Sequence, residues 1–165
     1  IMPIPEIKGR SICGADRPLS VSAIPVAGID LAPAVKMNCP TTVAFGQWVD
    51  TVVQPAAVRH FGQPVRKVLN SGSYQCRSVG FRRDSGWSEH AFANAIDVTG
   101  FELADGTRFK LLESWPAGDD RSAFLREVQD GACGIFSTVL GPEFDAQHAN
   151  HFHFDMRQRK KAYCR

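Results

Sequence analysis

The sequence lacks any apolar stretch that approaches the roughly 20 residues needed to cross a bilayer. Residues 1–5 lack the charged and apolar regions of a signal peptide, so the chain is expected to be either cytosolic or already trimmed. It also lacks a strong charge of either sign, since the net charge of +2 is too small to indicate a nucleic-acid partner. With no internal repeat and no evident linker, 165 residues predict a single domain.

Cysteine pairs of the Cys-x-x-Cys type are also missing, and the five cysteines fit no zinc-finger spacing. Scattered cysteines are typical of one or two long-range disulfides in an oxidising compartment, which predicts a periplasmic or secreted protein; buried free thiols are the alternative. The sequence does not determine the pairing. An odd count leaves one thiol unpaired, for which Cys164 is the expected candidate, and a bond between Cys13 and Cys39 would pin the N-terminal segment.

Residues 1–40 are rich in proline, and their apolar residues show no sustained helical or strand periodicity. This pattern predicts an irregular arm with a short strand near residues 21–24. From Thr41, apolar residues at four-residue spacing predict a helix that Pro55 ends or kinks, with a further turn to His60. A second helix is expected from Asp119 or Asp120 to Gly131, and strands at 65–69, 95–103, 107–112, 136–140 and 151–156. We therefore expect an α+β fold, in which helices flank a small, mainly antiparallel sheet and arm 1–40 packs on a domain of residues 41–165.

One carboxylate, that of Asp97, interrupts a run of residues that otherwise predicts a buried strand. Its side chain alternates to the face opposite its apolar neighbours Ile96 and Val98. If that face is enclosed, the charge must be paired, hydrogen-bonded or bound to a metal. A solvated strand face is the simpler interpretation of Asp97 when it is taken alone.

A histidine cluster changes this interpretation. His151, His153 and Asp155 share one strand face, and His148 lies on the approach to the strand. Two imidazoles on one strand face lie about 7 Å apart, so one is expected to bind a metal while the other stands beside it.

Two imidazoles and a carboxylate suit a catalytic zinc ion, which takes three protein ligands and leaves a fourth position for water. Such a site lowers the pKa of bound water and polarises a carbonyl. The same ligands are compatible with other divalent metals. If His151 or His148 completed a tetrahedron, the metal would instead be structural.

The spacing Ser88-x-His90-x(6)-Asp97, followed by His151-x-His153, resembles the metal-binding signature of the lysostaphin/D-Ala-D-Ala/hedgehog group of zinc peptidases. The bacterial extensin-like C-terminal domain family is similar over about residues 13–155, through the segments 72–77, 131–133 and 139–142. The resemblance implies a D-Ala-D-Ala peptidase/hedgehog-like fold. It also implies zinc-dependent hydrolysis of stem-peptide or cross-link amide bonds in peptidoglycan, by a chain expected to be monomeric.

Carried over by position, the resemblance implies that His90, Asp97 and His153 are the metal ligands. Arg77 would bind the substrate carbonyl or steady the oxyanion, a role that suits a fixed cation, and a surface ion pair is the alternative. Ser88 would support a ligand or contact substrate, or would simply cap a local turn.

The sequence departs from the usual pattern of these zinc peptidases at the general base, the residue that accepts a proton from the attacking water. Asn150 occupies the position where many relatives have a glutamate, and an amide cannot take the proton. The His-x-x-His-x-His variant of a branch of murein endopeptidases is matched by His148, His151 and His153, and either of the first two could act as the base. Strand alternation favours His151. The group's usual glycine between the first two ligands is Ala93 here, a small change.

The missing glutamate also supports a rival function, a cell-wall-binding or scaffolding module that retains the metal site but does not catalyse. Glu89 and Asp155 are expected to contact solvent or to support the ligands, and His60 is expected to be structural.

Overall fold

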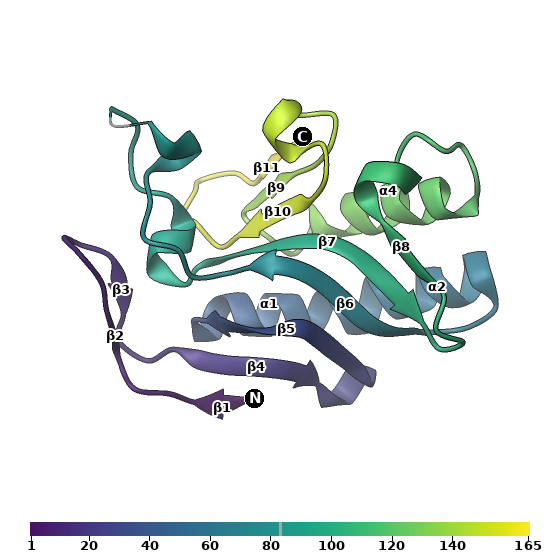
Figure 1. Cartoon of the computed structure of the whole chain (residues 1–165), viewed down its shortest axis with the longest axis horizontal. Helices are drawn as coiled ribbons and strands as arrows, with labels where there is room; N and C mark the ends of the chain where they lie inside the picture. Colours follow the sequence, from purple (N-terminus) through teal and green to yellow (C-terminus); the bar gives the residue numbers. More distant parts are fainter. Residues whose placement is uncertain (83) are drawn as a thin grey trace.

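The computed structural model describes residues 1–82 and 84–165, and over these residues nine strands form one sheet (Figure 1). Its order is β1-β4-β5-β6-β7-β10-β9-β11, with β8 paired to β7; the pairs β5–β6 and β9–β11 are parallel and the others antiparallel. The strands are β1 (Met2–Pro3), β4 (Leu19–Ile24), β5 (Ile29–Met37), β6 (Val65–Gly72), β7 (Ala95–Leu103), β8 (Arg108–Lys110), β9 (Thr138–Leu140), β10 (Phe152–Asp155) and β11 (Tyr163–Cys164). A mainly antiparallel sheet is confirmed, but the sheet is mixed and larger than predicted.

Within the predicted irregular arm over residues 1–40, β4 confirms the short strand expected near residues 21–24, whereas the irregular conformation expected after it is wrong, because β5 is a strand. Strands β4 and β5 pair with each other, and β5 also pairs with β6, so no boundary at residue 40 separates the N-terminal segment from the sheet. Strand β5 was not predicted because Pro33 lies within it. Proline is tolerated there because Pro33 has no paired residue on either neighbouring strand, so no hydrogen bond is lost with its missing N–H. The first half holds the small hairpin β2 (Ile7–Lys8) and β3 (Gly14–Ala15).

The first helix is longer than predicted, because α1 (Cys39–Trp48), the π-helical turn η2 (Val49–Val53) and α2 (Gln54–Phe61) follow one another without a break. Asn38 caps it by accepting a hydrogen bond from the Thr41 amide at 3.0 Å. Pro55 does not end the helix, because it occupies the first turn of α2, directly after the π-helical turn, where its missing N–H is tolerated.

Helix α4 (Asp120–Ala132) begins at the predicted cap, with the Asp119 carboxylate accepting hydrogen bonds from two backbone amides. Gly131 does not stop it. A Cβ atom at Gly131 would lie 2.4 Å from Val52, so the glycine allows close packing of α4 on η2. The short helix α3 (Leu111–Ser114) replaces the end of the strand predicted at 107–112. The 3₁₀ turns are η1 (Pro25–Ala27), η3 (Val79–Phe81), η4 (Glu89–Phe92) and η5 (Ala146–His148).

The hydrophobic core lies between one face of the sheet and the helices (Figure 1). Trp48 of α1 is fully buried, donates a hydrogen bond from Nε1 to the Val128 carbonyl of α4 at 2.9 Å, and packs edge-on against Phe154 of β10. Phe152 and Phe154 therefore point toward the helices. The alternating residue, His153, points to the opposite face of the sheet.

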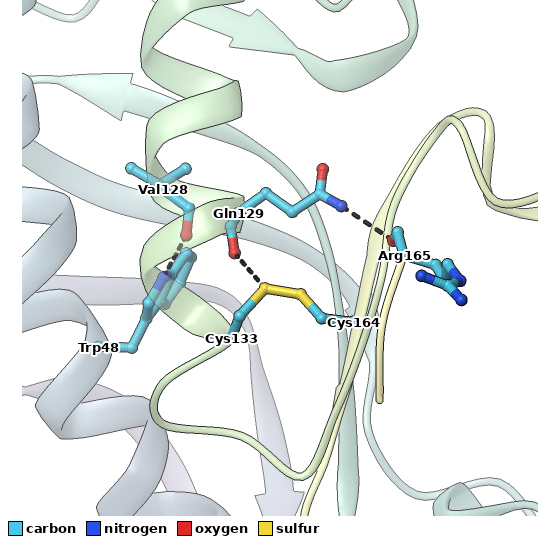
Figure 2. Close-up of a disulfide and its surroundings, with 6 residues drawn as sticks. All are labelled: Trp48, Val128, Gln129, Cys133, Cys164 and Arg165. Atoms are coloured by element: carbon cyan, nitrogen blue, oxygen red, sulfur yellow. Dashed lines mark hydrogen bonds between the residues drawn. A yellow bond between two sulfur atoms is a disulfide. The ribbon is translucent and has the colours of Figure 1, made fainter. Parts of the chain in front are cut away.

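Two disulfides join distant segments, Cys13 to Cys76 and Cys133 to Cys164. Figure 2 shows the second bond between the end of α4 and β11, beside a hydrogen bond from Gln129 to the Arg165 carbonyl. The bond considered between Cys13 and Cys39 is thus not formed, the expectation of an unpaired Cys164 is wrong, and the free, exposed thiol is that of Cys39. No helix among the described residues combines the length and apolar character that a membrane span requires.

Candidate metal centre

Three side chains predicted to bind a metal come together on the sheet face away from the helices. Asp97 lies on β7 and His153 directly opposite it on β10, while His90 belongs to the 3₁₀ turn η4 that precedes β7. One ligand atom from each of the three lies within 4.8 Å of the others.

The triangle of donor atoms has the size of a metal site. His90 Nε2 lies 3.1 Å from Asp97 Oδ1 and 3.1 Å from His153 Nδ1, and the remaining edge, from His153 Nδ1 to Asp97 Oδ1, is 3.0 Å. Tetrahedral bonds of 2.0–2.2 Å to zinc would separate ligand atoms by roughly 3.3–3.6 Å. A small shift of these side chains, each anchored in a different element, would therefore accommodate zinc.

Hydrogen bonds on the outer side of each imidazole fix its tautomer. His90 Nδ1 lies 2.6 Å from the Ser73 carbonyl, which can only accept, so this nitrogen carries the proton. His153 Nε2 likewise donates to the Asp155 carboxylate at 3.0 Å. In the neutral imidazoles, the inner nitrogens then present lone pairs to each other and to Asp97. Three acceptors that face one another at this distance can share a proton or bind a metal ion, and outer partners of this kind are typical of metal-binding histidines.

The cluster attracts positive charge even without an ion. Burial alone would lower the pKa of His153, but hydrogen bonds to Asp155 and Asp97 outweigh it and raise that pKa to about 9. Burial alone would raise the pKa of Asp97, yet hydrogen bonds from His153 and His90 hold it far below its usual range. A proton on the cluster thus occupies the place that a metal ion would take.

His151 stands beside the three ligands and is not part of the closely spaced group. Its Nε2 is 3.7 Å from Asp97 Oδ1, and its Nδ1 donates to the Asn150 side-chain carbonyl at 2.8 Å, which leaves the lone pair on Nε2. Burial is the main cause that lowers the pKa of His151, so this imidazole is neutral at pH 7. It lies immediately before β10, which begins at Phe152, one residue later than predicted.

His148 lies next to His151, with 5.0 Å between the two ring centroids. Its Nδ1 pairs with Asp145 Oδ1 at 2.7 Å, and its ring centroid is 6.2 Å from that of His153. The His-x-x-His-x-His segment therefore places all three imidazoles at one site, with His151 nearer than His148 to the Asp97 carboxylate.

The structure gives Arg77 and Ser88 local partners. Ser88 caps η4, its hydroxyl accepting a hydrogen bond from the His90 amide at 3.4 Å, which is the turn cap weighed as an alternative above. The Arg77 guanidinium donates to the Gln75 side chain at 2.9 Å and lies 4.8 Å from the centre of the Phe81 ring. These contacts keep Arg77 within its own loop, and its predicted role toward substrate stays a prediction.

Sequence reasoning missed Ser73, whose carbonyl orients His90 while its hydroxyl exchanges two hydrogen bonds with the Lys36 backbone of β5. A residue that acts through its backbone carbonyl leaves no signal in its side-chain type. Of the two alternatives expected for Asp155, solvent contact or support of a ligand, the structure favours the second, because Asp155 is buried and accepts a hydrogen bond from His153. His60 has a partner away from the cluster, Glu127 Oε2 at 2.7 Å, as expected of a structural residue.

The Asn94 side-chain amide links η4, the turn that carries His90, to the start of α1. Its nitrogen donates to Glu89 at 2.6 Å, and its oxygen accepts from Asn38 and Thr41 at the start of α1. Ala93 lies between these groups with a φ of 52°, in the left-handed region that glycine adopts without strain. The alanine that replaces the usual glycine is therefore accommodated at a small conformational cost.

Comparison with known proteins adds one finding. The model of a single protein family, described as the C-terminus of extensin-like proteins, matches residues 1–165, a wider span than the motifs alone indicated. Neither the curated proteins nor the solved structures contain a significant match. Since the family model spans all the residues that build the sheet and the histidine cluster, the chain belongs to the extensin-like protein C-terminus family.

Proposed function

We propose that this protein is a zinc-dependent peptidoglycan peptidase that hydrolyses stem-peptide or cross-link amide bonds. The observation that carries the proposal is the convergence of three acceptor atoms, from His90, Asp97 and His153, whose tautomers and charge suit a divalent cation. Three ligands, with His151 beside them and outside the group, match the composition of catalytic zinc sites, which keep one position open. A bound zinc ion would polarise the scissile carbonyl and acidify a water molecule.

The chain's own residues supply the remaining chemistry. His151 is neutral and directs an unprotonated Nε2 toward the cluster, so it can accept a proton from the attacking water in place of the absent glutamate. Asn150 fixes the tautomer of His151 through Nδ1 and so takes a positioning role. Asp155 and Ser73 hold the imidazoles of His153 and His90 in the orientation that binding requires.

The proposed location follows from the disulfides. Two bonds that join segments 63 and 31 residues apart are typical of an oxidising compartment, which favours a periplasmic or secreted protein.

Turnover of purified sacculi tests the proposal. The zinc-loaded protein should release shortened muropeptides, and His153→Ala should abolish release, whereas His60→Ala, which removes a histidine outside the cluster, should not. If His151 is the base, His151→Ala should retain zinc and lose about 10²–10⁴-fold in kcat.

The second candidate function, a wall-binding module without catalysis, is favoured by Asn150 in the usual glutamate position. Sacculi that bind the zinc-loaded protein and yet release no peptide, across several sacculus types, would decide for this module. A metal with four protein ligands, including His151 or His148, would instead indicate a structural zinc site.

A further inference from the structure

Positive charge is concentrated in one short segment that the proposed mechanism does not use. Residues 157–165, called here the cationic tail, contain no acidic residue, and the other 156 residues carry 14 Lys and Arg against 17 Asp and Glu. All the charged side chains of the tail are exposed. They are Arg157, Arg159, Lys160, Lys161 and Arg165.

The cationic tail borders the metal centre on two sides. Arg159 Nε donates to the Thr138 hydroxyl at 3.0 Å, and Thr138 lies directly opposite Asp155, the carboxylate that supports His153. Arg157 Nε lies 3.7 Å from the carboxylate of Glu89, the residue next to His90 in η4. The tail therefore contacts residues adjacent to two of the three ligands, on the sheet face that carries them.

The tail is held in place, unlike a freely solvated terminus. Tyr163 and Cys164 form β11 against β9, and Cys164 is bonded to Cys133 of the segment after α4. The Arg165 carbonyl accepts hydrogen bonds from Gln129 Nε2 at 3.0 Å and from the Gly141 amide at 2.9 Å (Figure 2). Fixed charges bind a partner at a smaller entropic cost than mobile ones.

Most of this charge has no counterion within the described residues. Arg157 alone among the five forms an ion pair there, with Glu89. The guanidinium groups of Arg159 and Arg165 lie instead over the Tyr163 ring, 5.6 and 5.4 Å from its centre. A fixed, uncompensated group of cations beside a reactive centre raises the local concentration of an anionic ligand.

We propose that the cationic tail binds free carboxylates of the polymer whose amide bonds the metal centre cleaves, so that the substrate class is an anionic peptide strand. This inference rests on the proposed function, because peptidoglycan stem peptides carry such carboxylates. The tail's position beside the ligands favours a substrate over a lipid surface. So does its scarcity of large exposed apolar side chains, since Tyr163 is the only one among the described residues of the tail.

The test compares two doubly charge-reversed variants. Lys160→Glu/Lys161→Glu alters the tail, whereas Arg66→Glu/Lys110→Glu makes the same change in charge at exposed positions on β6 and β8, outside the tail. Binding to purified sacculi is measured in the His153→Ala background, so that turnover does not interfere. The tail variant should bind on the order of tenfold more weakly at low salt, and the control variant should bind as its parent does.

Sacculi with chemically amidated carboxylates complete the experiment. The parent protein should bind them as weakly as the tail variant binds native sacculi, and raised salt should reduce only the binding to native sacculi. Equal binding of the tail variant and its parent, or tight binding of the parent to amidated sacculi, would overturn the inference. Capture by anionic lipid vesicles that the tail variant alone loses, with sacculus binding unchanged, would assign the tail to a membrane instead.

The two proposals fail separately. Carboxylate-dependent binding without any release of peptide by the zinc-loaded protein would remove the peptidase and leave the tail as a wall-binding surface. Release of peptide at equal rates by the tail variant and the control variant would leave the peptidase and remove the role of the tail.

Discussion

Zinc should stabilise the folded chain, because the three facing acceptors of His90, Asp97 and His153 exist only when η4, β7 and β10 are assembled. At a free zinc concentration 100 times the dissociation constant, binding contributes about 2.7 kcal/mol to the free energy of unfolding. For a domain of this size, that corresponds to a rise of roughly 5–10 °C in Tm.

Variants of the site should reduce the rise in Tm on zinc binding by different amounts. His153→Ala removes a ligand and should abolish the shift. Asp155→Asn keeps a hydrogen-bond acceptor for His153 Nε2 but removes the charge, and a change in a supporting residue costs about 10–100-fold in metal affinity. At the same zinc concentration the stabilisation should then fall to about 0.4–1.4 kcal/mol. His60→Ala, outside the cluster, should retain the full shift.

Differential scanning calorimetry of chelator-stripped protein, with and without added zinc, measures these shifts, and renewed chelation should reverse them. An unchanged Tm at saturating zinc, or the same shift in His153→Ala as in the unaltered protein, would refute zinc binding by the three facing acceptors. A full shift in Asp155→Asn would refute only the role assigned to Asp155.

Three further outcomes are expected. Replacing Cys13 and Cys76 together by serine should lower the free energy of unfolding by about 4 kcal/mol, because the bond closes a loop of 63 residues. Ala93→Gly should change stability by less than about 1 kcal/mol, since relief of the left-handed backbone offsets the added chain entropy, whereas Ala93→Val should destabilise strongly. Glu127→Gln should lower the free energy of unfolding by up to about 1 kcal/mol at pH 7 and by nothing in strong acid. Hydrogen bonds from Arg59 and His60 lower the pKa of Glu127 below its usual 4.5. The carboxylate therefore stabilises the fold above pH 4.5, and this stabilisation is lost as the pH falls through the lowered pKa.

Denaturant unfolding curves measure all three changes. Cys39→Ser is the control for the disulfide, since it removes a free thiol, and a loss as large as that of the double variant would contradict the role given to the bond. A stable Ala93→Val would show that the turn tolerates a branched side chain there. A cost of Glu127→Gln that did not decrease with acidity would indicate packing by Glu127 in place of an ion pair.

The site was more predictable than the sheet around it. Strand alternation alone placed His153 on the face opposite its phenylalanine neighbours, and the structure confirms this. The prediction succeeded because β10 is short, central and regular, so local periodicity determines which way each side chain points. The register that sets His153 opposite Asp97 was not accessible, because it depends on pairing between residues 56 positions apart.

The N-terminal half of the fold was less predictable, for a physical reason. Proline usually excludes a central strand, yet Pro33 is accommodated where the ladders on both sides of β5 are interrupted. Disulfide partners depend on the three-dimensional path of the chain, which spacing does not encode, so the sequence left the pairing open and the expectation of an unpaired Cys164 failed. Strand pairing and disulfide pairing are both long-range contacts, which local sequence patterns do not determine.

The sheet order has a consequence for how the protein reaches its native state. Strand β10 inserts between β7 and β9, although each of its residues lies 54 to 60 positions along the chain from its partner on β7. Pairings of such large sequence separation form late in folding, because the entropy of closing the loop must be overcome before the contacts reward it. His153 therefore joins the other two ligands only in a nearly complete sheet, and partly folded chains would be unable to capture the metal.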